Sequence, residues 1–448
     1  MTQSEGRASL GPADLERLVA LALDEARKQG ADQAEVAASH DQGLSATARL
    51  GDVENLEYTS DRGIGITVYK NSCKGSASTS DVSEQAICEA VAKACTFATV
   101  TAADPYAGLA DAELMCTDIK DIELDFEWGI DAQEAIALAI ETEAAALQLD
   151  DRINNSEGAT VDTNRGTRTY GNSHGFIGSV SRTSHSITCV VLAESDGVMQ
   201  RDYFYTAARD PDDLDPASSV GQRAAQRTLA RLGARKLTTR RAPVLLVPEL
   251  ARGFVGHAIG AISGGAQYRR SSFLLDAKGK QVFPDFVDIQ ERPHLSKGMA
   301  SKSYDAEGVA TYDRDIVLDG VLQDYVLSSY SARRLGLTTT ANAGGTQNLI
   351  VPGGGKDKAA LIAEMGTGLL VEELIGQGVN GVTGDYSRGA VGHWIENGEV
   401  QFPVHEVTIA GNLLDLYQRI VAIGDDQDVR GGIRCGSLLL EEMTIAGA

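Results

Sequence analysis

Apolar residues recur every three or four positions near the start of the chain, which predicts an amphipathic helix from about residue 12. Pro12 suits the first turn of a helix, and Gly30 suits its end. The apolar stripe consists of Leu15, Leu18, Val19, Ala22, Leu23 and Ala26. From about residue 33 to 79 the spacing changes to two, which predicts antiparallel strands. A second helix follows over about 81–98, where Asp81 and Glu84 have the spacing of a capping box.

The same order of elements recurs further along the chain. Asp131 and Glu134, again in capping-box spacing, predict a helix that runs to about residue 149. A long strand-rich stretch over about 152–208 and a helix near 217–232 complete the second unit. The helix–strands–helix order thus occurs at about 12–98 and 131–232. No repeat is visible at the level of single residues, so the order alone does not indicate duplication.

A second half of the chain begins after the basic link 235–241. A strand at Val244–Val247 opens it, and the glycine-rich remainder contains two predicted helices, near 250–262 and 357–365. Helices that are segregated from antiparallel hairpins are typical of α+β proteins. We therefore predict an α+β fold with an N-terminal region of helices and antiparallel sheet, residues 1–238, packed with a β-rich C-terminal domain, residues 239–448.

The net charge of the protein argues against some classes of binding partner. The 448 residues include 63 acidic and 40 basic side chains, which leaves a net charge of −23. That field repels phosphate backbones and anionic lipids, so neither direct nucleic-acid binding nor a membrane partner is expected. Residues 1–11 are polar and carry no secretory signal, and no apolar stretch approaches the ~20 residues that span a bilayer. Together with six cysteines that form no C-x-x-C pair, these features predict a cytoplasmic protein.

Histidine supplies no local metal motif. His257 is the only helical candidate, but it is followed by Ala258, and the next turn offers only Ala261 and Ile262. A helical zinc site needs a second ligand one turn away and a carboxylate nearby. The seven histidines are His40, His174, His185, His257, His294, His393 and His405.

Two of these histidines flank a predicted hairpin. Asn397–Gly398 is a strong signal for a two-residue turn. Regular pairing across that turn places His393 opposite Phe402 and leaves His405 beyond the paired register. The two imidazoles are therefore not expected to be cross-strand neighbours.

No nucleophile or phosphate motif is complete. A G-x-S-x-G elbow is absent, and Gly353–Lys356 lacks the spacing and hydroxyl residue of a phosphate loop. Tyr170–Gly175 and Gly384–Ala390 instead combine glycines, hydrogen-bonding side chains and an aromatic ring. Both segments suit either structural turns or contacts with a peptide, because an arginine can fork onto a carboxylate or carbonyl. The candidate substrate contacts are Asp385, Tyr386 and Arg388.

Nine dispersed runs resemble the TldE proteins, also called PmbA, of the TldD–TldE family. The likeness extends from about residue 30 to the C-terminus and keeps the order of the runs. The runs are Val53–Tyr58, Gly65–Tyr69, Lys74–Thr79, Gly171–Gly175, Arg201–Tyr203, Ser329–Arg333, Glu364–Gly368, Gly384–Ala390 and Ile409–Leu413.

The resemblance implies a TldD/PmbA-like fold and a role in a TldD–TldE zinc metalloprotease that degrades unfolded peptides and processes peptide precursors. In TldD the metal lies on an H-E-x-x-x-H helix with a third ligand, a cysteine near the C-terminus. On that pattern His257 matches the first histidine and Cys435 the cysteine, whereas Ala258 replaces the glutamate base and Ile262 the second histidine. The resemblance thus implies no catalytic residue, metal site or cofactor in this chain, with zinc in a TldD-like paralogue as partner.

Three functions stay open at this point. The leading hypothesis is a subunit that docks on the TldD-like paralogue and helps to form the cavity for unfolded or precursor peptides. The alternatives are an autonomous metallopeptidase or hydrolase, with a different site or one completed by a dimer mate, and a modulator of DNA gyrase that acts through protein contacts. A chain that pairs with a homologue is also expected to form a homodimer when isolated.

Overall fold

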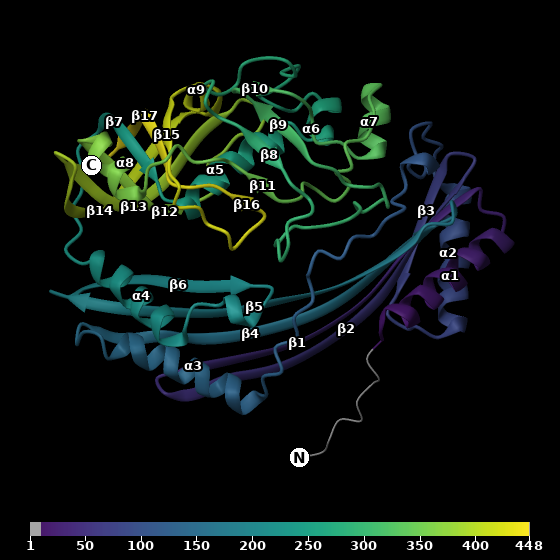
Figure 1. Cartoon of the computed structure of the whole chain (residues 1–448), viewed down its shortest axis with the longest axis horizontal. Helices are drawn as coiled ribbons and strands as arrows, with labels where there is room; N and C mark the ends of the chain where they lie inside the picture. The colour runs from purple at the N-terminus through teal and green to yellow at the C-terminus, as the bar shows by residue number, and fades with distance from the viewer. Residues whose placement is uncertain (1–9, 448) are drawn as a thin grey trace.

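A computed structural model describes residues 10–447. Residues 1–9, which carry most of the polar segment that argues against a secretory signal, lie outside this description. Figure 1 shows a long curved sheet with helices on its convex side and a β-rich lobe above its concave side. The predicted α+β class is confirmed.

The first part of the chain forms one six-stranded antiparallel sheet in the order β3-β2-β1-β4-β5-β6. Its two halves meet at β1 and β4, which pair from Glu35↔Asn172 to Ala48↔Ala159. The two predicted helix–strands–helix units therefore share a single sheet. Its strands are β1 (Gln33–Arg49), β2 (Asp52–Lys70), β3 (Cys73–Thr79), β4 (Ile153–Asn172), β5 (Ile177–Ser195) and β6 (Val198–Ala208).

Alternation along β1 decides which face of the sheet is covered. Val36 and Ala38 pack against one pair of helices, and Leu44 and Ala46, on the same face, pack against the other pair. The intervening side chains point to the concave face. The covering helices are α1 (Pro12–Lys28), α2 (Glu84–Val100), α3 (Ala132–Leu147) and α4 (Ala217–Ala230).

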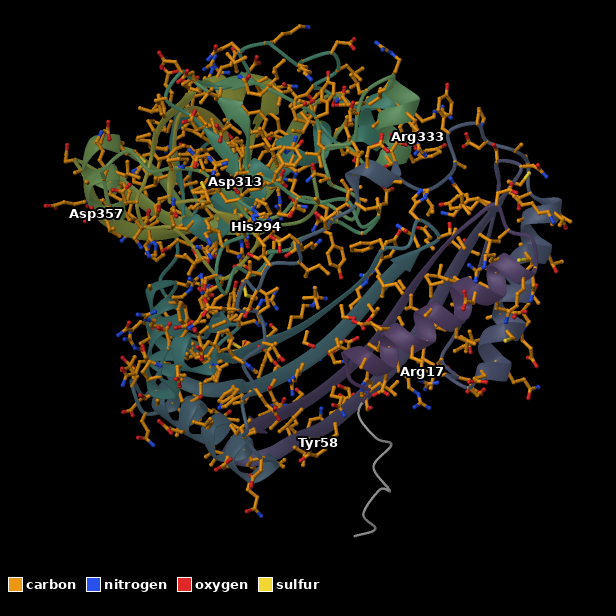
Figure 2. All side chains as sticks on the ribbon, turned by 45° about the vertical axis from the view of Figure 1, so that its right-hand side comes forward. Arg17, Tyr58, His294, Asp313, Arg333 and Asp357 are labelled. Atoms are coloured by element: carbon orange, nitrogen blue, oxygen red, sulfur yellow. The ribbon has the colours of Figure 1, made fainter. Side chains whose placement is uncertain are left out.

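The outer half of β2 is an exposed edge. Residues 52–63 pair with β1, whereas the pairing of β2 with β3 starts only at Ile64. Tyr58 is 67% exposed on this edge (Figure 2). Four acidic side chains lie on the same stretch, and charged residues are a common protection of exposed edges against aggregation.

The two predicted capping boxes have different outcomes. The one at Asp131 is confirmed, because its side chain accepts the backbone N–H of Gln133 and Glu134 and the Glu134 carboxylate reaches back. The one at Asp81 is wrong. Helix α2 begins after Ser83, whose hydroxyl accepts the N–H of Ala86, while Asp81 accepts the N–H of Ser83.

The C-terminal lobe, residues 240–447, is built on a sheet in the order β14-β13-β12-β7-β17-β15. Strand β14 also pairs with β17, so that five of these strands close into a ring around the largest hydrophobic cluster. The strands are β7 (Arg240–Leu246), β12 (Gly368–Ile375), β13 (Asp385–Glu396), β14 (Glu399–Asn412), β15 (Ile420–Ile423) and β17 (Leu438–Ala446).

A smaller five-stranded sheet, in the order β10-β9-β8-β11-β16, completes the lobe. Its strands are β8 (Ile289–Glu291), β9 (Arg314–Leu318), β10 (Val321–Leu322), β11 (Leu349–Ile350) and β16 (Ile433–Arg434). The two predicted helices are confirmed as α5 (Pro248–Ala261) and α8 (Lys358–Met365). Sequence patterns missed three helices of five to seven residues, too short to show a period: α6 (Gly264–Tyr268), α7 (Ser329–Leu335) and α9 (Leu413–Gln418).

The hairpin of β13 and β14 departs from the predicted register. A bulge between Trp394 and Ile395 places His393 opposite Pro403 rather than Phe402. A bulge inserts an unpaired residue, which a count from the turn cannot reveal. His405 lies in a second irregularity of the pairing and is not opposite His393, as predicted.

An ionic junction joins the lobe to the sheet. His393 Nδ1 lies 2.7 Å from Glu372 Oε2, and its Nε2 lies 3.0 Å from the carbonyl of Ala230 at the end of α4. Arg231 bridges Asp202 on β6 and Glu373 on β12. These contacts hold the lobe above one end of the concave face. No helix among residues 10–447 is long and apolar enough to cross a membrane.

Helices α3 and α4 touch at Gly221. A Cβ added there would lie 2.0 Å from the carbonyl oxygen of Thr142. We predict that Gly221→Ala lowers the free energy of unfolding by about 1–3 kcal/mol, because the helices must separate. Gly253→Ala is the control: this helical glycine has nothing within 4 Å of an added Cβ, so alanine should stabilise by up to about 1 kcal/mol. Urea denaturation measures both, and equal effects would contradict the contact.

The junction should depend on pH through His393. Burial disfavours the imidazolium, but the hydrogen bond to Glu372, the charge of Glu372 and the bond to the Ala230 carbonyl together outweigh it and raise the pKa of His393. Burial favours the neutral form of Glu372, but its hydrogen bond to His393 and the positive charges around it together outweigh burial, so the pKa of Glu372 is lowered. The contribution of the imidazolium is complete below about pH 6.5 and is lost as pH rises through the folded-state pKa. The contribution of the carboxylate is lost as pH falls below about 4.5.

We therefore predict that His393→Gln costs about 1–3 kcal/mol of unfolding free energy near pH 5.5 and clearly less at pH 8.5. Denaturation at the two pH values tests this. His405→Gln is the matched control, since His405 lies on the paired strand and forms no ion pair with any described residue. A pH-independent loss for His393→Gln would argue against the ion pair.

Candidate functional site

The candidate site lies on α5, which follows β7 directly. Pro248 occupies the first turn of the helix, and the helix runs to Ala261 with Ile262 as its C-cap. His257 lies in its third turn and is half-buried. The strand β7 lies within the ring of the lobe, so it fixes both the start and the direction of the helix.

The two positions that the resemblance assigns to a base and a second ligand face the hydrophobic core. Ala258 is 3% exposed and Ile262 is 2% exposed, and both belong to the main cluster of the lobe. Neither side chain has an atom that can bind a metal or accept a proton. The space that a base and a second imidazole would need is filled with apolar packing.

His257 contacts β13 instead. Its ring centroid lies 6.1 Å from that of Tyr386 in an edge-on arrangement. Burial and then the positive charge of Arg388 lower the pKa of His257. The imidazole is consequently neutral at pH 7, with a cation rather than a carboxylate as its charged neighbour.

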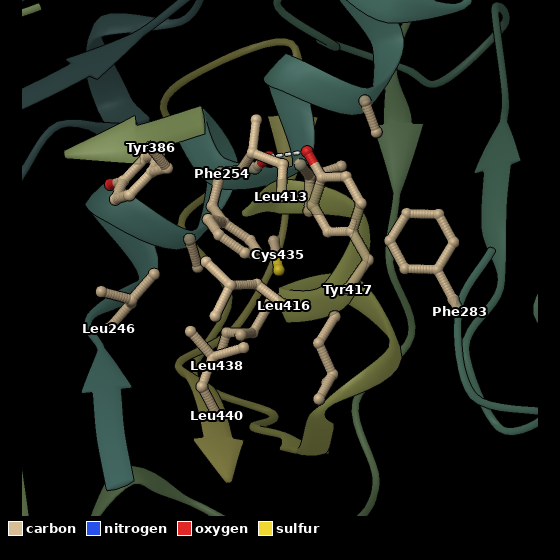
Figure 3. Close-up of a cluster of buried hydrophobic side chains, with 14 of the residues drawn as sticks. Leu246, Phe254, Phe283, Tyr386, Leu413, Leu416, Tyr417, Cys435, Leu438 and Leu440 are labelled. Carbon is tan, nitrogen blue, oxygen red and sulfur yellow. Dashed lines mark hydrogen bonds between the residues drawn. The ribbon is translucent and has the colours of Figure 1, made fainter. Parts of the chain in front are cut away.

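Cys435 lies inside the core. It is fully buried just beyond β16, among Phe254, Leu416, Tyr417 and Leu438 (Figure 3). Its thiol donates to the carbonyl of Gly436 at 3.3 Å. Burial raises the pKa of Cys435 to about 12, so the thiol is protonated at neutral pH.

The residues present do not fit a zinc site. Zinc takes three protein ligands even in an open catalytic site, and it binds the thiolate rather than the thiol. Here His257 and Cys435 are the only implied positions with a donor atom, and the environment of Cys435 disfavours the thiolate. Within residues 10–447, no three His, Cys, Asp or Glu side chains gather closely enough to hold a metal ion.

The three candidate substrate contacts lie on β13 but do not share a face. Tyr386 is 2% exposed and packs against Phe254. Arg388, two residues on, shares that face and is half-buried, and its Nε has no partner among the described residues. Asp385 points the other way, where it accepts a bond of 2.6 Å from Thr383. Of the three, Arg388 has donor capacity left for a ligand.

Sequence reasoning missed a group of cations on the concave face. A cavity of about 130 Å³ lies between the sheet and the segment 301–306 of the lobe. It is lined by four basic side chains: Lys120, Arg168, Arg182 and Lys302. The alternation of side chains along the predicted strands places Arg168 and Arg182 on an exposed face. Only the pairing of β4 with β5, however, shows that the two arginines are neighbours.

Models of one family cover most of the chain. The PmbA/TldA metallopeptidase domain 1 matches residues 34–98, the central domain matches 126–232, and the C-terminal domain matches 239–447. The last match contains α5 and Cys435, the two parts of the candidate site.

Relatives match over nearly the full length. Metalloprotease PmbA of Escherichia coli O157:H7 is 50% identical over 433 residues, which cover 97% of this chain and 96% of the relative. The metalloprotease PmbA homologue of Haemophilus influenzae is 47% identical with the same coverage.

Solved structures agree with the fold. A Bacteroides thetaiotaomicron protein, described as a candidate modulator of DNA gyrase, has a TM-score of 0.93 at 27% identity and covers 98% of this chain and 100% of its own. TldE from Thermococcus kodakarensis has a TM-score of 0.86 at 18% identity over 96% of this chain and 100% of its own, a likeness of fold.

The environment of Cys435 predicts both its reactivity and its role. We expect Cys435 to react with a thiol reagent only after unfolding, whereas Cys73, which is part-exposed, reacts in the native protein. Cys435→Ala should lower the unfolding free energy by about 1 kcal/mol through lost packing. Mass spectrometry after labelling gives the first result, and denaturation gives the second.

The metal content of the same samples provides the control. Purified wild type and Cys435→Ala should carry equally little zinc, and a chelator should not change their stability. One equivalent of zinc per wild-type chain, lost in the variant, would contradict this description of the site.

Proposed function

This chain belongs to the PmbA/TldD metallopeptidase family, and on that premise we propose that it is a TldE-like subunit of a TldD–TldE zinc metalloprotease. A TldD-like paralogue supplies the zinc and the catalytic base. The substrates are unfolded peptides and peptide precursors. This chain contributes walls of the cavity that receives them.

The packing of α5 carries the proposal. Ala258 and Ile262 fill the core at the positions where the catalytic pattern requires a base and a ligand. Peptide hydrolysis at a zinc site requires both the bound water and a group that takes its proton. A chain without these groups can serve the reaction by binding and positioning the substrate.

The free face of the sheet supports the substrate role. The concave face lies under the lobe and is lined by small and polar side chains, with grooves of about 880 Å³ and 460 Å³. Volumes of this size suit ligands rather than single waters. Arg388 beside His257 is a second candidate contact, because its Nε has no partner among residues 10–447.

The proposal extends to location and assembly. All six cysteines are free thiols, which suits a reducing cytoplasm. The edge of β2 at residues 52–63 offers unpaired backbone groups to another chain. In isolation the chain is expected to form a homodimer in place of the heterodimer.

A mixing experiment tests the assignment. Cleavage of an unfolded peptide is measured with this chain, with the TldD-like paralogue, and with both at equal concentration. We expect strong cleavage only in the mixture, and its loss when a chelator removes zinc. A single-residue change in the paralogue's glutamate base should abolish activity without preventing assembly, as size-exclusion chromatography would show.

The opposite pattern would overturn the proposal. Strong, chelator-sensitive cleavage by this chain alone would make it an autonomous enzyme. Failure to form a complex with the paralogue would remove the subunit assignment.

A further inference from the structure

Four cations surround the cavity between the sheet and the lobe, although the protein as a whole carries a net charge of −23. Arg168 and Arg182 rise from the sheet, Lys302 comes from the lobe, and Lys120 comes from the segment that leads towards α3. No carboxylate among residues 10–447 forms an ion pair with any of them. Other arginines on the sheet are paired with acids; Arg165, for example, pairs with Asp125 and Glu127.

The acid that lines the cavity and the imidazole beside Lys120 are already engaged, and a further acid, Asp41, lines the adjoining groove. Asp305 lines the cavity, but its carboxylate accepts backbone N–H groups of Glu307, Val309 and Ala343. Lys120 Nζ lies 3.2 Å from His294 Nδ1. An imidazole carries no negative charge, so this contact does not neutralise the lysine. His294 lies on the side of the lobe that faces the sheet (Figure 2). The charges of Asp305 and Glu291 offset part of the positive charge of Lys302, but no carboxylate among residues 10–447 forms an ion pair with the four cations.

The cations are close enough to repel one another. Burial, and then the charges of Arg182 and Arg168, lower the pKa of Lys302. Burial and the charge of Arg182 lower the pKa of the neighbouring Arg209 to about 10. Like charges gathered around one cavity repel one another, and a bound anion would relieve that repulsion.

The floor beside the cations is made of small residues. Cross-strand pairing aligns Gly65, Ala37 and Tyr170 in one row, and Gly63, Ser39 and Arg168 in the next. The groove over these rows shares Arg168 and Arg182 with the cavity. From β5 to β3 the floor spans four strand spacings of ~4.8 Å, roughly 19 Å, which is the length of about six residues of extended peptide.

The cavity closes this groove at one end. Val180 and Tyr170 form its floor, Ile122 and Leu124 one side, and Tyr304 with its neighbours the roof. Its volume of about 130 Å³ is close to that of a cavity that binds benzene, so it takes one apolar side chain. A peptide that enters along the groove meets an apolar pocket with cations around it.

We infer that this cavity and groove form a subsite for an extended peptide, in which Arg168 and Arg182 bind a carboxylate of the peptide. The inference rests on the proposed function in taking a peptide as the ligand. The carboxylate is either the C-terminus of the peptide or an acidic side chain, and an arginine fork binds both by paired, charge-assisted hydrogen bonds. The apolar pocket holds the adjacent side chain.

The test uses the full-length chain alone, without paralogue or zinc. Three peptides of seven residues carry an N-terminal fluorescein: a glycine–serine sequence that ends in leucine with a free carboxylate, its C-terminal amide, and an amide that contains one glutamate. Fluorescence anisotropy gives the dissociation constants. The free acid should bind at least tenfold more tightly than the neutral amide, and added salt should reduce the difference.

Variants tie the effect to the site. In Arg168→Gln/Arg182→Gln the free acid should bind no better than the neutral amide. Both side chains are exposed and form no ion pair with any described residue, so the variant should fold, which its thermal midpoint verifies. Arg165→Gln is the matched control, because Arg165 lies on the same strand and is held by acids on the other face; the tenfold difference should remain.

The glutamate peptide identifies the source of the carboxylate. If it binds like the free acid, side chains are recognised as well as the terminus; if it binds like the neutral amide, the terminus alone is recognised. Equal binding of acid and neutral amide to the wild type, or a difference that survives in the double variant, would overturn the inference. Failure of cleavage in the mixture with the paralogue leaves this binding result unaffected, so the two proposals can fail separately.

Discussion

The pairing of β1 with β4 is the constraint on which the architecture depends. It joins two helix–strands–helix units into one six-stranded sheet, although β1 ends at Arg49 and β4 begins only at Ile153. Because side chains alternate along each strand, the same pairing places both pairs of helices on one face and leaves the other face open. An antiparallel sheet can leave one face to solvent, and here the C-terminal lobe stands above that face (Figure 1).

Apolar and charged contacts both join the lobe to the sheet. Tyr304 and Val309 of the lobe pack against Tyr170 and Phe176 at the β4–β5 hairpin. Arg231, Asp202 and Glu373 link β6, α4 and β12, and His393 adds a bond to the end of α4. Such paired charges fix a geometry because each arginine or imidazole has few acceptable partners. The ionic junction lies at one end of the sheet, so the middle of the concave face stays accessible. Arg168 and Arg182 lie there and form no ion pair with any residue in the range 10–447.

Within the lobe, the ring of strands determines which side chains of α5 face the hydrophobic core. The helix follows β7 and turns Ala258 and Ile262 into the main core, while His257 faces Tyr386 and Arg388 on β13. A helix that could present catalytic groups is used here for packing. Cys435 likewise contributes to packing, because its thiol is buried in the hydrophobic cluster. Three positions that matter in the family resemblance, Ala258, Ile262 and Cys435, therefore contribute to the hydrophobic core of the lobe.

Local patterns in the sequence determined most of the helices, the alternation of the strands and the absence of a metal motif around His257. These features depend on residues that are close in the chain, so spacing and capping reveal them. The start of α2 at Ser83 rather than Asp81, the bulge at Trp394 and the short helices α6, α7 and α9 escaped, because a competing hydrogen bond or one unpaired residue leaves no periodic signal. The tertiary structure alone decided that two units share a sheet, that Cys435 is enclosed by apolar side chains and that four cations surround one cavity. Each of these features depends on contacts between residues that are distant in the sequence. Strand pairing and burial between separate segments stabilise such contacts, so no single segment of the sequence reveals them.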